Sequence, residues 1–316
     1  MPASGRTFHA AIGQLRDELE RCLVEFKPDL SQEVNPRLGS AWDQDLLEER
    51  PRSADHRVGR LHLHPVLAGY WYGFAGADVM LGVRDCLGSG SLYSAGALSR
   101  VAMEAFAWGS WIWEPKLPLD NRIMRGLLCR KHEVNQLIKN YEKRINANQG
   151  QPDSCLLTAE DAGSAVQIVE HWKRWRAMLI ADIETVKSLP GNASSESRPS
   201  SITDLVTKTL DDLVEIPGAG EGRYGLHSGL LHLGEGSIAL RFPRDMPTGF
   251  ATQPNIELER FMPVIREAIL VMRYYLQQRA ECWGLDPPDV RLQPLVDALI
   301  EASSQPEETL MFMPDD

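Results

Sequence analysis

Two charged side chains lie inside the most apolar stretch of the sequence, residues 92–113. Arg100 and Glu104 are the charged residues of this stretch, and four positions separate them. On a helix this spacing places both side chains on one face, where they can form an ion pair. Desolvation offsets much of the attraction in a buried pair, so stability alone does not explain its presence. Two explanations stay open: a structural clamp that fixes helix register, or a site in which Arg100 binds an anion and Glu104 orients it.

A second group of polar residues lies further along the chain. Tyr224, Ser228 and His232 recur every four residues, so a helix would align a phenol, a hydroxyl and an imidazole on one face. Gly225 and Gly229 leave room for a helix or a ligand to approach closely. A serine and a histidine at this spacing form no catalytic dyad without an orienting acid and an oxyanion site. The pattern indicates either a binding stripe or a core histidine bonded to a neighbouring helix.

Three short patterns accompany one another in the chain: Arg-x3-Glu at 100–104, Pro-Ser-Ser-Ile-Thr-Asp-Leu-Val at 199–206, and Tyr-x3-Ser-x3-His-x-Gly at 224–234. With them, residues 65–280 resemble an uncharacterised family of helical bacterial proteins. That family is distantly similar to AbiV-type abortive-infection proteins and to HEPN domains. The resemblance implies a HEPN-like core that brings polar residues together from two packed helices. These characteristic polar residues would be Arg100, Glu104, Tyr224, Ser228 and His232.

The sequence departs from the motif of HEPN ribonucleases, in which four to six residues separate an arginine from a histidine. Here three residues separate Arg223 from His227, and eight separate Arg223 from His232. Arg100 could take the place of the motif arginine in space, but not in sequence. The departure weakens the case for RNA cleavage, because a shared fold does not by itself carry an activity.

The favoured function is a binding or regulatory protein of the bacterial defence or stress type, with a polar pocket between the helices at 92–113 and 221–234. The alternatives are a HEPN-like ribonuclease and a small-molecule enzyme with a helical pocket, so catalysis stays an open question. In a ribonuclease, His232 would be the base or an orienting group, Arg100 would stabilise phosphate charge, and Glu104 would be the third candidate. The expected partner is a small ligand or a protein, with RNA and a homodimer as further candidates.

His62 and His64 form a His-x-His pair just before a long apolar segment. Such a pair can chelate a metal ion, but a zinc site needs a third and a fourth ligand. The spacing of the other ligand-type residues predicts neither, so we expect no metal and no cofactor.

Tryptophan alternates with basic residues in one segment. Trp172 and Trp175 lie among the basic side chains at 173–176, a pattern that can stack nucleic-acid bases. Tryptophans in such a helix more often pack into the core while the basic side chains reach solvent. We therefore favour a structural role for this segment and keep nucleic-acid binding as the minor alternative.

The elements that must position these residues are helices, because apolar side chains recur at three- and four-residue steps and the segments end at Pro, Gly or Asn. Residues 237–242 could form one short extended piece, but no alternating stretch is long enough for a sheet. The sequence thus predicts an all-α bundle of about eight to nine helices. The expected helices are 6–27, 65–86, 92–113, 120–145, 158–189, 201–215, 221–234, 256–283 and 288–303.

The predicted organisation has three parts. Residues 1–57 are expected to form an N-terminal helix and an irregular connector, because prolines and charges interrupt the second half of this segment. Residues 58–303 are expected to form the bundle, with a flexible loop at 190–200 where the chain reads PGNASSESRPS. Residues 304–316 are expected to be a disordered acidic tail.

Composition points to the cytoplasm. Lys and Arg number 33 and Asp and Glu 44, a net charge of −11 that repels phosphate backbones at long range. The five cysteines include no Cys-x-x-Cys pair, which fits free thiols in a reducing compartment. Residues 92–113 are long enough to span a bilayer, but Arg100 and Glu104 would each cost about 2.5–3.5 kcal/mol at its centre. We therefore expect no membrane association.

Overall fold

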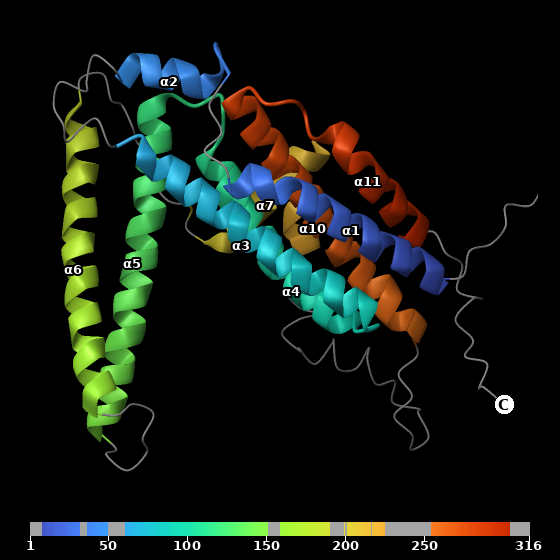
Figure 1. Ribbon diagram of the computed structural model, residues 1–316, viewed down its shortest axis with the longest axis horizontal. Helices are drawn as coiled ribbons and strands as arrows, with labels where there is room; N and C mark the ends of the chain where they lie inside the picture. The colour runs from blue at the N-terminus through green and yellow to red at the C-terminus, as the bar shows by residue number, and fades with distance from the viewer. Residues whose placement is uncertain are drawn as a thin grey trace, which may run out of the picture. The chain divides into compact units, whose positions relative to one another are not determined.

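The computed structural model describes residues 8–31, 37–49, 61–150, 159–189, 199, 201–215, 217–224 and 254–303 (Figure 1). Within these ranges the chain forms helices and contains no strand, which confirms the all-α prediction. A further helical stretch covers residues 219–224. The described helices with full bounds are α1 (Phe8–Ser31), α2 (Ala41–Glu49), α3 (Leu63–Gly88), α4 (Leu92–Ile112), α5 (Leu119–Gly150), α6 (Ala159–Ser188), α7 (Ile202–Val214), α10 (Pro254–Trp283) and α11 (Asp289–Ser303).

The helix α2 lies inside the segment that was expected to be an irregular connector. Ser40 precedes it, and the Ser40 hydroxyl accepts a hydrogen bond from the Asp43 backbone N–H at 3.1 Å. The Asp43 carboxylate accepts in turn from the Gly39 N–H at 2.7 Å, so two N–H groups at the start of the helix are satisfied. The indole of Trp42 stacks on that of Trp283, with ring centres 5.3 Å apart. A distant aromatic partner therefore anchors this short helix, and such a contact is not readable from local sequence.

Contacts between residues divide the chain into two compact units. The first unit comprises residues 1–43, 70–111 and 199–316, and the second comprises residues 44–69 and 112–198. The predicted boundaries after residues 57 and 303 stay a prediction.

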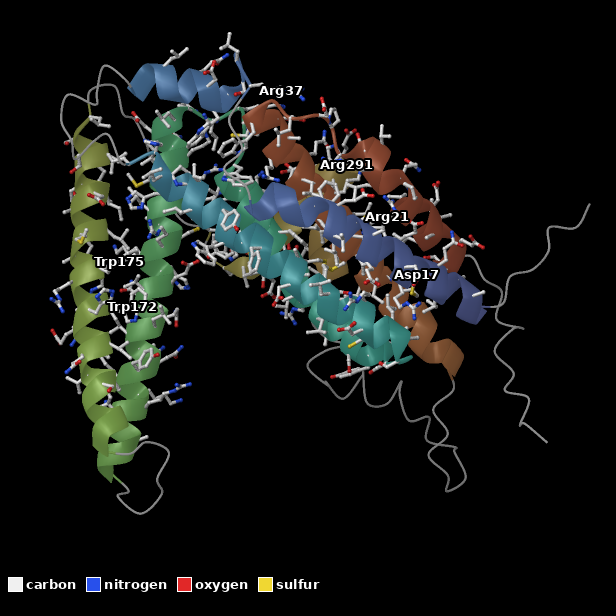
Figure 2. All side chains as sticks on the ribbon, viewed as in Figure 1. Asp17, Arg21, Arg37, Trp172, Trp175 and Arg291 are labelled. Atoms are coloured by element: carbon white, nitrogen blue, oxygen red, sulfur yellow. The ribbon has the colours of Figure 1, made fainter. Side chains whose placement is uncertain are left out.

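The N-terminal helix belongs to the first unit because α1 packs along α11 (Figure 1). Arg21 donates a hydrogen bond from Nη2 to the backbone carbonyl of Arg291 at 3.2 Å (Figure 2). The guanidinium of Arg291 lies 4.5 Å from the centre of the Phe26 ring. Buried Leu15 and Leu19 face the core from the same helix. Together these contacts fix the N-terminal helix to the C-terminal one.

Glycines on α3 receive aromatic side chains in each unit. In the first unit, the Tyr275 hydroxyl abuts Gly73 and the Phe106 ring abuts Gly76, and the two rings lie 5.4 Å apart. In the second unit, Gly69 contacts the indole of Trp113. A side chain at any of these glycines would occupy the place of an aromatic ring, so the close packing of α3 depends on their lacking one.

The helix α3 also differs from the other described helices in its apolar composition. Of the residues described, it is the helix long and apolar enough to cross a membrane, and 33% of its most apolar window is buried. The sequence alone had indicated residues 92–113 as the segment long enough to span a bilayer. Length and composition are the basis of this finding, and the core helix of a soluble protein meets the same criteria.

The second unit is built on a hairpin of α5 and α6, which run side by side (Figure 1). At 1.5 Å per residue, the 32-residue α5 is about 48 Å long. Its buried stripe recurs at three- and four-residue steps and meets an equivalent stripe on α6. The shared core comprises Leu61, Leu119, Ile123, Met124, Leu127, Val134, Ile138, Val169, Leu179, Ile183 and Val186.

Arginine side chains hold the loop that leads into α5. Buried Arg122 donates from Nη1 to the carbonyls of Glu114 and Pro115, at 3.3 and 3.1 Å. Arg125 forms an ion pair with the Glu114 carboxylate at 2.8 Å. These bonds tie the first two turns of α5 to the loop before it and so fix the direction in which α5 begins.

The start of α3 crosses α5 at Gly126, where the two backbones meet without an intervening side chain. A Cβ atom at Gly126 would lie 2.5 Å from the backbone nitrogen of Pro65, closer than packed atoms approach. Pro65 is in the first turn of α3, where the missing N–H costs no intrahelical bond. The Pro65 carbonyl accepts a hydrogen bond from Nε1 of Trp113 at 3.1 Å. The backbone contact at Gly126 and the hydrogen bond from Trp113 therefore both fix the start of α3.

We expect Gly126→Ala to lower the free energy of unfolding by about 1–3 kcal/mol, because the added methyl group overpacks a contact between backbones. Urea denaturation followed by circular dichroism measures the change. Gly163→Ala is the matched control, since Gly163 is on α6 with no atom within 4 Å of its would-be Cβ. This control should be neutral or stabilising by up to about 1 kcal/mol, as alanine favours the helix. Equal effects of the two substitutions would contradict a tight crossing at Gly126.

Candidate functional site

Arg100 and Glu104 of α4 meet Tyr224, the last described residue of the segment 217–224. The Tyr224 hydroxyl donates to Oε1 of Glu104 at 2.6 Å, and Nε of Arg100 donates to the same oxygen at 3.2 Å. Arg100 also donates to the Tyr224 hydroxyl, from Nε at 3.3 Å and from Nη2 at 3.1 Å. Its guanidinium carbon lies 5.0 Å from the centre of the Tyr224 ring. The structure thus brings together three residues that the sequence patterns had singled out.

The turn that delivers Tyr224 to α4 is fastened to α7. A capping box begins α7, in which Ser201 and Asp204 satisfy each other's backbone N–H groups. Later in the same helix, the Asp211 carboxylate accepts from the N–H groups of Gly220 at 2.6 Å and Gly218 at 3.0 Å. These two backbone hydrogen bonds lower the pKa of Asp211, so the carboxylate is ionised at neutral pH. The turn is thereby fixed immediately before the helical stretch that carries Tyr224.

Tyr224 remains a protonated donor over the physiological pH range. Burial, together with the hydrogen bond to Glu104, raises the pKa of Tyr224 to about 12. The side chains of Arg100 and Glu104 retain exposures of 16% and 29%, so solvent reaches the pair but not the phenol, which is buried. The neighbouring Arg223 lies 3.7 Å from Glu267 of α10, a carboxylate that is almost fully buried. Two successive residues thus connect this stretch to α4 and to α10.

This geometry describes part of the predicted site. Ser228 and His232 lie outside the described residues, so the predicted pocket between 92–113 and 221–234 is described only as far as Tyr224. Most of the predicted loop at 190–200, the extended piece at 237–242 and the tail at 304–316 also lie outside them. The role of the cluster as a ligand site stays a prediction. The contacts themselves show a hydrogen-bonded clasp between α4 and residues 217–224.

A cavity of about 300 Å³ lies in the second unit, between the start of α3 and the middle of the α5–α6 hairpin. Its walls are mainly apolar. The apolar lining comprises Leu63, Leu67, Trp175, Met178 and Leu179. Leu179 is buried, whereas Met178 is 62% exposed, so the cavity opens to solvent on the Met178 side. A cavity of this kind, with few polar groups, is typical of small-molecule sites.

Three polar side chains form a chain along one wall of the cavity: Arg130, His64 and Asp182. Nη1 of Arg130 lies 2.9 Å from Nδ1 of His64. A guanidinium can only donate, so Nδ1 must accept, and the neutral ring carries its proton on Nε2. Nε2 faces the Asp182 carboxylate at 3.4 Å. Arg130 therefore donates to His64, and the ring N–H of His64 faces Asp182.

The imidazole of His64 is uncharged at neutral pH. Burial is the main cause, and the positive charge of Arg130 and the nearby His62 add to it, so that the pKa of His64 falls to about 4. Burial also lowers the pKa of Arg130, although the carboxylates of Glu133 and Asp182 act in the opposite sense. The guanidinium remains a cation and lies 4.7 Å from the centre of the Trp175 ring. The wall therefore combines a buried cation with a neutral imidazole.

The role of His64 differs from the one that the sequence indicated. The His-x-His pattern indicated His64 only as half of a metal-binding pair, whereas both of its nitrogens face protein partners. In the ranges that the structure describes, no group of three His, Cys, Asp or Glu residues is placed to hold a metal ion. A signal was present nonetheless: Arg130 lies between Leu127 and Val134, at a position of the α5 stripe that a core residue would occupy.

The tryptophans of α6 pack within the hairpin (Figure 2). Trp172 and Trp175 contact the hairpin core, and their ring centres lie 5.9 Å apart in an edge-to-face arrangement. Lys173 turns to carboxylates instead, at 3.3 Å from both Glu142 and Glu170. This arrangement agrees with the structural interpretation of the segment rather than with base stacking.

Removing the Tyr224 hydroxyl should weaken the clasp. We expect Tyr224→Phe to lower the free energy of unfolding by about 1–2 kcal/mol, because a short hydrogen bond to a carboxylate is lost. Thermal and urea denaturation measure the change. Tyr141→Phe removes a hydroxyl from a partly buried tyrosine of α5 for which the described residues show ring packing but no hydroxyl hydrogen bond. If the two variants lose the same stability, the clasp contributes nothing specific.

The depressed pKa of His64 makes a prediction about acid. The folded state resists protonating this imidazole while the unfolded chain does not, so stability should fall as the pH drops from about 6.5 towards 4. The expected loss attributable to His64 is about 2–3 kcal/mol. Urea midpoints of wild type and His64→Gln between pH 7 and pH 4 measure it, and the variant should show a shallower decline. His171→Gln, at an exposed position of α6, should follow the wild-type slope. A slope unchanged in His64→Gln would contradict a buried neutral imidazole.

Comparison with known protein families, with curated proteins and with solved structures finds no match to this chain. The resemblance to AbiV-type proteins and HEPN domains, including the HEPN-like core, therefore stays a prediction.

Proposed function

We propose that this chain is a binding or regulatory protein that takes a small ligand into a pocket between helices. The cavity of the second unit carries the proposal. It has a volume of about 300 Å³, mainly apolar walls and one chain of polar side chains. Small-molecule sites share these properties: concave apolar surfaces bury the body of the ligand, and a few placed polar groups orient it.

Binding is favoured over catalysis because the candidate acid–base groups already have partners. Nδ1 of His64 accepts from Arg130, and Nε2–H faces Asp182, so the ring has no nitrogen available to take a proton from a substrate. In the first unit, Glu104 accepts from both Tyr224 and Arg100. A small-molecule enzyme would need a base or a nucleophile that these contacts leave available.

The biological setting is proposed from the residue patterns. On the resemblance of residues 65–280 to a bacterial family similar to AbiV-type proteins, the protein acts in bacterial defence or stress, in the cytoplasm. The ligand would then be the signal to which the protein responds, and a protein partner, another copy included, would receive it.

The ribonuclease alternative has less support from the geometry. Arg223 is the arginine nearest in sequence to His227, and it lies 3.7 Å from the buried carboxylate of Glu267. The nearby carboxylate of Glu267 would compete with a phosphate for this arginine. Arg100 is likewise engaged by Glu104 and Tyr224.

The cavity should bind an aromatic probe of matching size. We expect 2-naphthoate or its uncharged amide, 2-naphthamide, to bind with one-to-one stoichiometry in isothermal titration calorimetry. Leu67→Trp should weaken binding about tenfold or more, because a larger side chain at this half-exposed lining residue fills the cavity. Val166→Trp, at an exposed apolar position of α6 outside the lining, should leave binding unchanged. Binding of neither probe, or equal binding to both variants, would overturn the proposal.

A ribonuclease assay provides the opposing outcome. Purified protein is incubated with labelled mixed RNA, without and with Mg²⁺ or Mn²⁺, beside folded Arg100→Ala and His232→Ala variants. The proposed function predicts intact RNA in every sample. Cleavage that both substitutions abolish would instead establish a ribonuclease and place its site at the α4 cluster.

A further inference from the structure

The cation of Arg130 is only partly compensated by its surroundings. Among the residues described, its guanidinium makes one hydrogen bond, to a neutral imidazole, and forms no ion pair with a carboxylate. Its other close partner is the face of Trp175, at 4.7 Å. A partly buried charge without a directly bound counter-charge is costly, and the free energy of the site falls when an anion supplies one.

The guanidinium is also held in a fixed orientation. An arginine carries five N–H donors in a planar fork, and the hydrogen bond to His64 uses one of them. The Trp175 ring restrains the plane, while Nδ1 of His64 restrains the Nη1 side. Arg130 itself lines the cavity, so its remaining donors are the charged groups that a bound molecule would meet there. A fork of this kind matches a carboxylate, which accepts two parallel hydrogen bonds.

Asp182 limits how much negative charge the cavity accepts. It lies on the far side of the imidazole, where Nε2 of His64 faces its carboxylate at 3.4 Å. The three polar groups carry one positive charge, on Arg130, and one negative charge, on Asp182, and the carboxylate of Glu133 also acts on Arg130. A ligand with a single negative charge can pair with Arg130 against the repulsion of Asp182, which lines the same cavity. A second charge would add repulsion without gaining a second cation.

The rest of the cavity selects an apolar body. Leucine, methionine and tryptophan side chains make up the other walls, and a cavity of about 300 Å³ is at the lower end of the range for small-molecule sites. Free acetate or phosphate would leave these walls exposed to water. A compact aromatic or branched hydrocarbon would cover them.

We propose that the ligand of this cavity is an apolar carboxylate with a single negative charge, whose carboxylate binds Arg130 and whose hydrocarbon body fills the space between α3 and α6. This inference rests on the proposed binding function and names the chemical class of its ligand. Arg130 is the residue that distinguishes the acid from an uncharged molecule of the same shape.

The test compares probes that differ in charge and share a ring system. Isothermal titration calorimetry at pH 7 measures 2-naphthoate, 2-naphthamide and 2-naphthyl phosphate against the full chain. We expect naphthoate to bind at least about tenfold more tightly than the amide, as a charge-assisted hydrogen bond allows. Naphthyl phosphate, which carries more negative charge near Asp182, should bind more weakly than naphthoate.

Variants assign the preference to Arg130. Arg130→Gln should reduce the naphthoate-to-amide ratio to about one while leaving amide binding within about threefold. Arg144→Gln is the matched control, because Arg144 is another arginine of α5 next to an aromatic ring, that of Tyr141, and does not line the cavity. It should retain the full ratio. Should Arg130→Gln fail to fold, Arg130→Lys keeps the charge but loses the fork, and a reduced ratio is expected there.

The outcomes test the charge of the ligand and the proposed binding function separately. Equal binding of naphthoate and naphthamide to the wild-type chain overturns this inference and leaves the proposed binding function standing. Binding of neither probe overturns both. A preference for naphthoate that survives in a folded Arg130 variant also overturns the inference, because another group would then recognise the acid. Tighter binding of naphthyl phosphate than of naphthoate overturns the restriction to a single charge.

Discussion

The cavity of the second unit depends on the direct contact between the backbones of α3 and α5 at Gly126. Because α5 has no side chain at this position, the start of α3 can approach it at Pro65. Arg130 follows Gly126 by one turn on α5, and His64 precedes Pro65 on α3, so the crossing also sets these two side chains 2.9 Å apart. Burial is the main reason that the imidazole is uncharged, and the positive charge of Arg130 adds to it, while the hydrogen bond from Arg130 leaves the ring proton on Nε2. The absence of a side chain at Gly126 thus allows the contact that shapes this cavity wall.

The helices could be predicted from sequence because their apolar residues recur with a regular period and their ends carry Pro, Gly or capping residues. The helix α2 could not, since its anchor is a stack between Trp42 and Trp283, more than two hundred positions apart in the chain. The same distinction divides the sites. Arg100 and Glu104 are four residues apart on one helix, so sequence spacing predicts their pairing. The chain from Arg130 through His64 to Asp182 joins three helices, and periodicity does not say which faces meet.

The polar cluster at α4 and the polar wall of the cavity contain similar residue types but differ in how their charges are arranged. At α4, the arginine, the carboxylate and the phenol bond to one another, and the Glu104 oxygen that accepts from Tyr224 also accepts from Arg100. Charge is balanced within the cluster, which therefore joins two segments of one unit. At the cavity, the neutral ring of His64 contacts both the Arg130 cation and the Asp182 carboxylate, and the cation borders an apolar space. The balanced charges at α4 hold two segments together, whereas the partly compensated cation at the cavity favours binding of an anion.

The glycines of α3 carry a consequence for the way in which the protein folds. Five glycines lie in this 26-residue helix, and each lowers helix propensity by roughly 0.5–1 kcal/mol relative to alanine. Alone in water, such a segment has little tendency to be helical, so the helical conformation of α3 depends on tertiary packing, including the contacts of Tyr275, Phe106 and Trp113 with three of its glycines. The helix that begins at the cavity is thus stabilised by aromatic rings from other segments, and the cavity depends on the same packing.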